Sequence, residues 1–121
     1  MKSEYVIEKK ENYLYITVSG EYDKDDFLQY PKLVSEACEK EKIYKVLFNG
    51  MNLNGTNAPT MDRYFIGESI ALLLGPQIKI AAVWPGNHIN KFAETVAVNR
   101  GAQILVVGDV ESAKDWLLKE G

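Results

Sequence analysis

Three short apolar runs, separated by segments with helical periodicity, constrain the fold of this chain more than any other feature. They span residues 43–49, 78–84 and 103–107, and residues with turn propensity bound them. A continuous apolar strand is expected where helices cover both faces of a sheet, and strands that alternate with helices form parallel sheets. The sequence therefore predicts a parallel β-sheet with helices packed against it.

The first third of the chain adds two strands and a helix. Residues 5–9 and 13–19 are rich in β-branched and aromatic side chains and are joined by a short polar turn, which predicts a β-hairpin. Asp23 is the expected N-cap of a helix that ends near residue 41. Because Pro31 lies inside this segment, either the helix kinks there or a short first turn gives way to a helix that begins near Pro31.

The later connections complete the predicted fold. A polar loop over residues 50–59 precedes an apolar helix, for which Thr60 is the expected N-cap. Asn90 and Asp109 are expected to cap the two remaining helices. The predicted fold class is therefore α/β, with a mixed, mainly parallel five-stranded sheet and four helices. An N-terminal β-hairpin is followed by β-α repeats, and a single domain spans residues 1–121.

Charge and composition argue against several classes of partner. The 121 residues carry a net charge of −3, and acidic residues flank the short basic runs. Such a domain is a poor electrostatic match for nucleic acid or for an anionic membrane surface. No apolar run is long enough to span a membrane or to act as a secretory signal. We therefore predict no nucleic-acid partner, no membrane span and a cytoplasmic location.

The sequence contains no recognisable catalytic set. His88 is the only histidine, is expected to be exposed in a turn, and offers no partner for a metal-binding pair or a Ser-His-Asp arrangement. Cys38 is the only cysteine and falls on the apolar side of a helical pattern. The glycines match neither a phosphate-binding loop nor a dinucleotide fingerprint. We therefore expect a protein that is not an enzyme and that binds no metal ion or cofactor.

The loop and helix start after the third strand form the first candidate binding site. Ligands of open α/β domains usually bind beyond the carboxyl ends of parallel strands, and a helix start there offers free N–H groups. A phosphate or carboxylate could bind at Thr60 with help from Arg63, although Asp62 already supplies negative charge; alternatively, Thr60 only caps the helix. The candidate residues for binding a partner or ligand are Asn54, Thr56, Asn57, Thr60, Asp62 and Arg63.

Aromatic side chains form the second candidate site. Tyr64, Phe65, Trp84 and Phe92 fall on two helices and a strand end that would face the same side of the fold. They either line an apolar pocket or belong to the core. A pocket there would suit a small apolar or lipid-like ligand, so a carrier or sensor of such a ligand is the alternative function.

Several motifs resemble the STAS domain, the fold of bacterial anti-sigma-factor antagonists and of the cytoplasmic tails of sulfate transporters. The motifs are Gly20-Glu-Tyr-Asp23 after the second strand, Tyr30-Pro-Lys-Leu33 near a helix start, and Tyr44-Lys-Val-Leu-Phe-Asn49. Residues 60–69 and 92–101 are similar to segments of small stand-alone STAS-like proteins of bacteria and archaea, some of which are also described as CRAL/TRIO-like. The resemblance covers most of the chain in the order of its elements.

The resemblance implies a non-enzymatic regulatory module that docks on a protein partner, or on itself, through the loop and helix start after the third strand. STAS domains carry a phosphorylated serine in an Asp-Ser-Ser-Gly-Leu motif at that helix start, and this motif is absent here. Thr60 takes the topological place of that serine, and Thr56 is a second candidate for phosphorylation. An exposed sheet edge at the N-terminal hairpin would also permit a homodimer.

Overall fold

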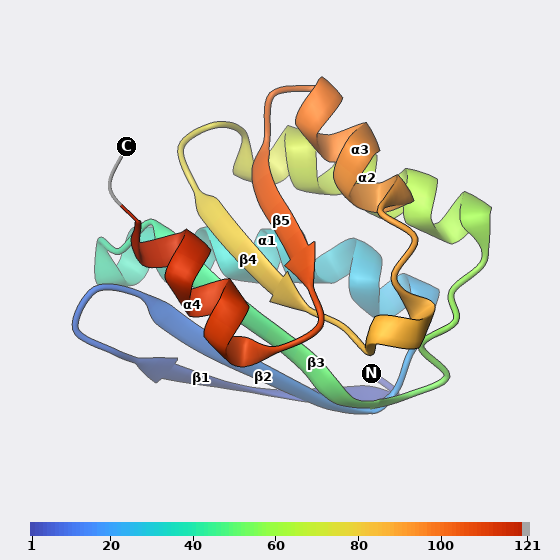
Figure 1. Ribbon diagram of the computed structural model, residues 1–121. Coiled ribbons are helices and arrows are strands. Elements are labelled where there is room, and N and C mark those ends of the chain that lie inside the picture. The colour runs from blue at the N-terminus through green and yellow to red at the C-terminus, as the bar shows by residue number, and fades with distance from the viewer. Residues whose placement is uncertain (120–121) are drawn as a thin grey trace.

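The computed structural model describes residues 1–119 as a five-stranded sheet with four α-helices (Figure 1). The elements are β1 (Ser3–Lys9), β2 (Leu14–Glu21), α1 (Lys24–Glu41), β3 (Lys45–Asn54), α2 (Thr60–Leu74), β4 (Lys79–Val83), the 3₁₀ helix η1 (Gly86–His88), α3 (Phe92–Asn99), β5 (Gln103–Val107) and α4 (Val110–Leu118). The strand order is β1-β2-β3-β4-β5; β1 pairs with β2 antiparallel, and the other neighbours are parallel. The predicted α/β class and its mixed, mainly parallel sheet are confirmed.

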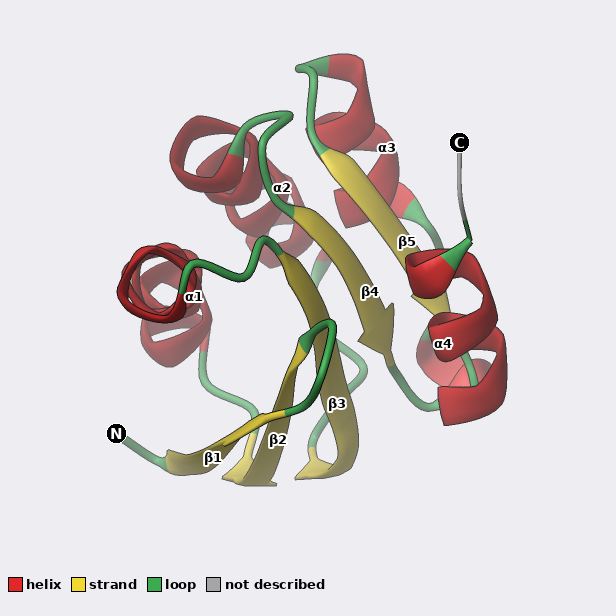
Figure 2. Ribbon diagram, turned by 90° about the vertical axis from the view of Figure 1, so that its left-hand side faces the viewer, coloured by secondary structure: helices red, strands yellow, loops and turns green. Residues whose placement is uncertain are grey.

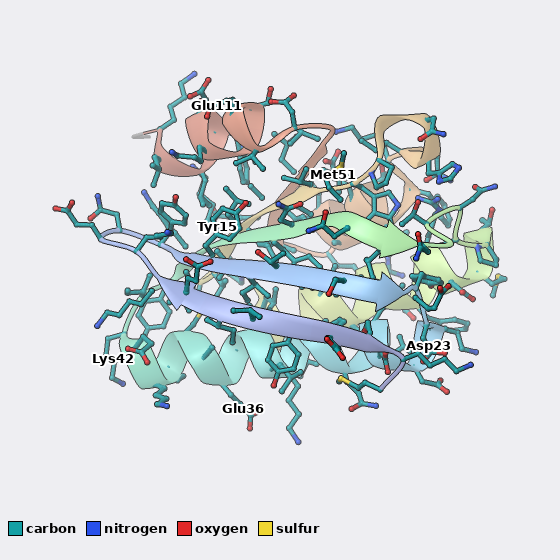
Figure 3. All side chains as sticks on the ribbon, turned by 90° about the horizontal axis from the view of Figure 1, so that it is seen from below. Tyr15, Asp23, Glu36, Lys42, Met51 and Glu111 are labelled. Atoms are coloured by element: carbon teal, nitrogen blue, oxygen red, sulfur yellow. The ribbon has the colours of Figure 1, made fainter. Side chains whose placement is uncertain are left out.

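Helices cover both faces of the sheet (Figure 2). On one face α1 packs against α2 and α2 against α3, whereas α4 packs on the other face over β3, β4 and β5. Figure 3 looks onto β1, β2 and β3 and labels Tyr15 of β2, which packs against the core under α4, and Met51 of β3, which is exposed. Within residues 1–119, no helix combines the length and the apolar character that crossing a bilayer requires.

Two apolar cores follow from this arrangement, one on each face of the sheet. The larger core lies between the sheet and helices α1 to α3 and contains Phe48 and Ile80. The smaller core joins Leu47 and Ala81 to Leu117 of α4. Because successive side chains of a strand point to opposite faces, β3 and β4 are apolar on both sides, as their uninterrupted apolar runs predicted.

The first helix is continuous, although Pro31 lies in its interior. Asp23 is its N-cap, as predicted, and accepts a hydrogen bond of 3.1 Å from the Asp26 N–H. Lys42 ends the helix in a left-handed conformation, with φ of 56°, and donates its N–H to the Cys38 carbonyl. A separate short turn before Pro31, one of the two alternatives, is therefore wrong.

The third strand extends further than the sequence predicted. It runs to Asn54, so residues 50–54, which were expected in a loop, belong to the strand, and residues 52–54 pair with the end of β2 beyond a β-bulge. Gly50 is required here, because a Cβ at this position would lie 2.8 Å from the Trp84 ring. The Asn and Gly residues that resemble loop signals therefore belong to a bulged and partly exposed strand.

Two predicted helix caps are wrong. The second helix begins at Thr60 itself, with Pro59 in the N-cap position and no side chain capping the first turn. The third helix has Lys91 as its N-cap, in a left-handed conformation with φ of 63°. The Asn90 side chain instead accepts a hydrogen bond of 3.0 Å from the N–H two residues later, which forms a turn before the helix. Asp109 caps α4 as predicted.

Candidate binding site

The loop between β3 and α2 is held in place by the connection that follows β4. Trp84 Nε1 donates a hydrogen bond of 2.9 Å to the Thr56 carbonyl, and the Thr56 hydroxyl oxygen lies 2.7 Å from His88 Nδ1. Thr56 is consequently only 3% exposed. His88 was expected to be exposed but is half-buried, because η1 folds it against this loop.

Arg63 completes this contact from the first turn of α2. Its Nε donates a hydrogen bond of 2.9 Å to the Ala58 carbonyl, and its Nη2 donates one of 2.8 Å to the His88 carbonyl. The residue is 8% exposed, and burial lowers the pKa of its guanidinium. No carboxylate within residues 1–119 lies at ion-pair distance from it. Arg63 is thus a buried cation whose hydrogen-bond partners are two neutral carbonyl groups.

Asp62, the neighbour of Arg63 in sequence, is engaged elsewhere. It accepts a hydrogen bond of 2.9 Å from the Tyr22 hydroxyl. Burial raises the pKa of Tyr22, and the hydrogen bond to Asp62 and its negative charge raise it further. The phenol therefore stays protonated and ties the start of α2 to the segment between β2 and α1.

Arg63 and Trp84 line an apolar cavity of about 120 Å³ between the sheet and helices α1, α2 and α3. Aromatic and aliphatic side chains from the strands and all three helices form most of the wall. They include Phe27, Val34, Phe48, Ile66, Ile70 and Ile104. The charged residues of the lining are Arg63, Lys91 and Glu94.

Lys91 and Glu94 pair with each other at the start of α3. Lys91 Nζ lies 3.2 Å from Glu94 Oε1, which also accepts a hydrogen bond of 2.6 Å from the Val106 N–H. Lys91 donates a further hydrogen bond to the Val106 carbonyl. These contacts occupy backbone groups of the edge strand β5. Among the described lining residues, Arg63 is therefore the charged group without a partner of opposite charge.

The six predicted binding residues separate into an exposed and a buried group. Asn54, Asn57 and Thr60 are exposed, Asp62 is half-buried, and Thr56 and Arg63 are buried. The structure brings Thr56 and Arg63 together through their shared contact with His88, whereas Thr60 lies at the surface. Of the two candidate phosphorylation sites, Thr60 is thus the one at the surface.

The four aromatic residues expected to line an apolar pocket are not brought together. Of these four residues, Trp84 is the one that lines the cavity. Tyr64 and Phe65 pack against each other with ring centroids 5.4 Å apart, and Phe65 and Phe92 are exposed. The helical repeat explains this correction, because Ile66 occupies the cavity side of α2 and the two preceding residues are turned away from it.

Sequence reasoning missed several residues that line the cavity. They are Tyr22, Phe27, Asn90, Lys91 and Glu94, among others. The opposite charges of Lys91 and Glu94, three residues apart, indicate a pair within a helix. No local pattern, however, places that pair beside the edge of β5.

The second helix carries apolar side chains on its solvent side as well as on its core side, with Glu68 among them on the solvent side. Met61, Phe65 and Leu72 are 60%, 44% and 83% exposed, and their spacing places them on one side of the helix, which we call the outer face of α2. A surface helix usually carries polar residues on that side. Clustered exposed apolar side chains indicate contact with another molecule.

Comparisons with known proteins identify solved structures with a similar fold. No protein-family model and no curated protein matches the sequence. Among solved structures, an anti-sigma factor antagonist from Mycobacterium paratuberculosis has a TM-score of 0.65 at 10% identity, over 97% of this chain and 95% of that one. An uncharacterized protein of the DUF3478 family with a SpoIIAA-like fold, from Shewanella loihica PV-4, has a TM-score of 0.55 at 22% identity, over 95% of this chain and 93% of that one. The chain has a STAS-like fold, as its motifs indicated.

Proposed function

We propose that this protein is a non-enzymatic regulatory module that acts by docking on a protein partner. The observation that carries the proposal is the outer face of α2, where Met61 and Phe65 are exposed immediately after the helix start. The similarity in fold to an anti-sigma factor antagonist supports a regulatory role. A helix start beyond the carboxyl end of a parallel strand is also a common place for binding in α/β folds.

The proposed docking surface combines this apolar face with the polar residues around it. Met61 and Phe65 would form the centre of the contact, and Asn54, Asn57 and Thr60 its polar rim. Interfaces are commonly built in this way, with methionine and aromatic residues in the centre and polar groups around them. Asp62 and Arg63 would act indirectly, since their hydrogen bonds hold the helix start in position.

Thr60 is the proposed site at which this surface could be regulated. A phosphate there would add up to two negative charges in the first turn of α2, where the helix dipole favours them. The same charges would lie beside Met61 and would change the affinity for a partner. Thr56 remains a second candidate, but its hydroxyl would have to leave His88 before a kinase could reach it.

A photoreactive amino acid at position 65 tests the docking proposal in the cells that make the protein. We expect a discrete crosslinked species from position 65 and none from position 36, an exposed site on α1 that is labelled in Figure 3. With the crosslinked partner purified, Phe65→Glu should weaken binding by about tenfold or more, because it buries a charge at the centre of the contact. Identical crosslinks from both positions, or unchanged affinity, would refute the proposal.

A second copy of this chain is the alternative partner. Light scattering, which measures the mass in solution, distinguishes such a homodimer from a monomer that binds another protein. A wild-type mass near twice 13.6 kDa that Phe65→Glu reduces to 13.6 kDa would identify α2 as a homodimer interface. A dimer that Phe65→Glu leaves intact but Val6→Lys disrupts would instead use the exposed edge strand β1.

The cavity supports a second candidate function, the carriage or sensing of a small apolar ligand. Ligand sites are commonly lined by apolar and aromatic side chains with a few polar groups, and the lining of this cavity has that character. Native mass spectrometry of freshly purified protein tests this proposal directly. A retained mass that disappears in Ala82→Leu, which would fill part of the cavity, supports a carrier; the same mass retained by both proteins contradicts it.

A further inference from the structure

We propose that the cavity binds a small carboxylic acid with an apolar tail, and that Arg63 holds its carboxylate. This inference rests on the second proposed function and adds the chemical class of the ligand. It starts from Arg63, which is 8% exposed, lines the cavity and has no carboxylate at ion-pair distance within residues 1–119.

The hydrogen bonds of Arg63 leave part of its guanidinium available. Nε and Nη2 donate to the carbonyls of Ala58 and His88, and no hydrogen bond within the described chain uses Nη1. No fully buried side-chain nitrogen or oxygen in residues 1–119 lacks a partner, so Nη1 must retain accessible surface. A guanidinium with an accessible N–H is well suited to a carboxylate oxygen.

The other charged groups near the cavity do not neutralise Arg63. Lys91 and Glu94 offset each other through their 3.2 Å contact. Asp62 accepts the hydrogen bond of the Tyr22 hydroxyl and is not at ion-pair distance from Arg63. A buried charge without a counterion is costly, and a ligand that brings one negative charge would remove this cost. A phosphate ester would bring up to two negative charges against one unpaired cation, so the charge balance favours a carboxylate.

The size and walls of the cavity define the rest of the ligand. An apolar cavity of about 150 Å³ accepts a benzene molecule, so a cavity of about 120 Å³ holds a chain of about five carbon atoms. The walls beyond Arg63 are largely aliphatic and aromatic, including Phe48, Ile66 and Ile104. Hexanoate, which has a five-carbon tail and one carboxylate, is therefore the probe that fits these observations.

NMR titration at pH 7.5 compares hexanoate with hexan-1-ol and hexylamine, which have tails of similar length but no negative charge. We expect hexanoate to bind wild-type protein about tenfold or more tightly than either probe, because a hydrogen bond to a charged group adds to the burial of the tail. Shortening the acid by one methylene should weaken binding about fourfold. The shifted methyl resonances should be those of Ile66, Ile70 and Ile104.

Three variants locate the site. Arg63→Gln should remove the preference for hexanoate over hexan-1-ol, whereas Arg100→Gln, which changes an exposed arginine of the same charge, should retain it. Ala82→Leu should weaken the binding of both hexanoate and hexan-1-ol, because the larger side chain fills part of the cavity. Unchanged hexanoate binding in Ala82→Leu, or a preference that survives Arg63→Gln, would overturn the proposal. If Arg63→Gln fails to fold, the comparison of the three probes on wild-type protein decides.

The outcomes also separate this inference from the function on which it rests. Equal binding of hexanoate and hexan-1-ol to wild-type protein would overturn the carboxylate inference and leave an apolar carrier. Binding of none of the three probes to folded protein would overturn both.

Discussion

The two faces of the sheet are packed in different ways. Under α4, Leu47, Ala81, Ala113 and Leu117 have no exposed surface, and the small alanines let helix and sheet approach closely. Under α1, α2 and α3, aromatic rings meet edge to face, and a cavity of about 120 Å³ remains. Protein interiors are normally close-packed, and a void forfeits contact energy. The difference indicates that close packing on the α4 side contributes more to stability, whereas the other side gives up part of this contribution where the cavity lies, which is the proposed ligand site.

On the cavity side, polar contacts attach the helices to the two edge strands of the sheet. At one end Asp26 of α1 accepts hydrogen bonds from the N–H and the hydroxyl of Ser3 and from the Lys2 N–H, at 2.9, 2.8 and 2.9 Å. At the other end Glu94 of α3 accepts the N–H of Val106 in β5. These contacts fix the outer helices to the two edge strands and so keep the walls of the cavity in position.

The largest expected effect is on the closely packed side. Leu117→Ala removes a fully buried side chain from a core with little room to collapse, so we expect a loss of about 2–5 kcal/mol in the free energy of unfolding. Urea denaturation measures it. Leu72→Ala makes the same chemical change at a residue that is 83% exposed and should cost less than about 0.5 kcal/mol. Similar losses in the two variants would mean that the α4 core is not closely packed.

The polar contact at Asp26 should appear in the pH dependence of stability. Burial alone would raise the pKa of Asp26, but hydrogen bonds from Ser3 and Lys2 outweigh it and hold the pKa below its ordinary value. A carboxyl whose pKa is lower in the folded state stabilises the protein above the unfolded value, about 3.9, and loses this contribution as the pH falls through the folded value. We therefore expect the melting temperature to decrease as the pH is lowered below about 4.

Asp26→Asn tests the source of this acid transition. It weakens charge-assisted hydrogen bonds to a buried group and should cost about 1.5–3 kcal/mol at pH 7. It should also flatten the decline at low pH. Asp25→Asn, at the exposed neighbouring carboxyl, is the control. An acid transition that Asp26→Asn leaves unchanged would show that the contact with β1 does not hold the cavity side together.

Two neighbouring alanines of β4 compare the two faces directly. Ala81 is fully buried under α4, whereas Ala82 lines the cavity. Ala81→Val should destabilise the protein by about 1–3 kcal/mol through overpacking. Ala82→Val should be neutral or stabilise it by up to about 1 kcal/mol, because the added methyl groups occupy free space. Chemical denaturation of both variants checks this, and equal destabilisation would contradict the contrast between the faces.

The sequence predicted the fold well because the signals of the fold are local. The apolar runs of β3 and β4 follow from burial on both faces, and the caps Asp23 and Asp109 lie beside the helices they serve. The end of β3 was missed because its Asn and Gly residues favour a loop, and only pairing with β2 overrides that preference.

The candidate site was harder to predict because its contacts are distant in sequence. Arg63 was predicted from the sequence to help bind an anion at Thr60, but its burial involves a hydrogen bond to the carbonyl of His88, 25 residues later. The cavity depends on how aromatic rings from α1, β3 and the end of β4 tilt against one another. No spacing within one helix or strand encodes such an arrangement, so the sequence suggested an apolar pocket near Trp84 but not the residues that line it.

The last comparison of the two faces concerns the starts of α4 and α2, where we expect the smallest effect on the free energy of unfolding. Asp109 accepts hydrogen bonds from the Ser112 N–H and hydroxyl at 2.8 and 3.0 Å, so Asp109→Ala should cost about 0.5–2 kcal/mol. Thr60 lies inside α2 and caps nothing, so Thr60→Ala should cost less than about 0.5 kcal/mol in the same denaturation experiment. An equal cost would mean that Thr60 caps α2 in solution. Its hydroxyl would then be bound to the helix start, and the polar rim of the docking surface would lose the residue proposed for its regulation.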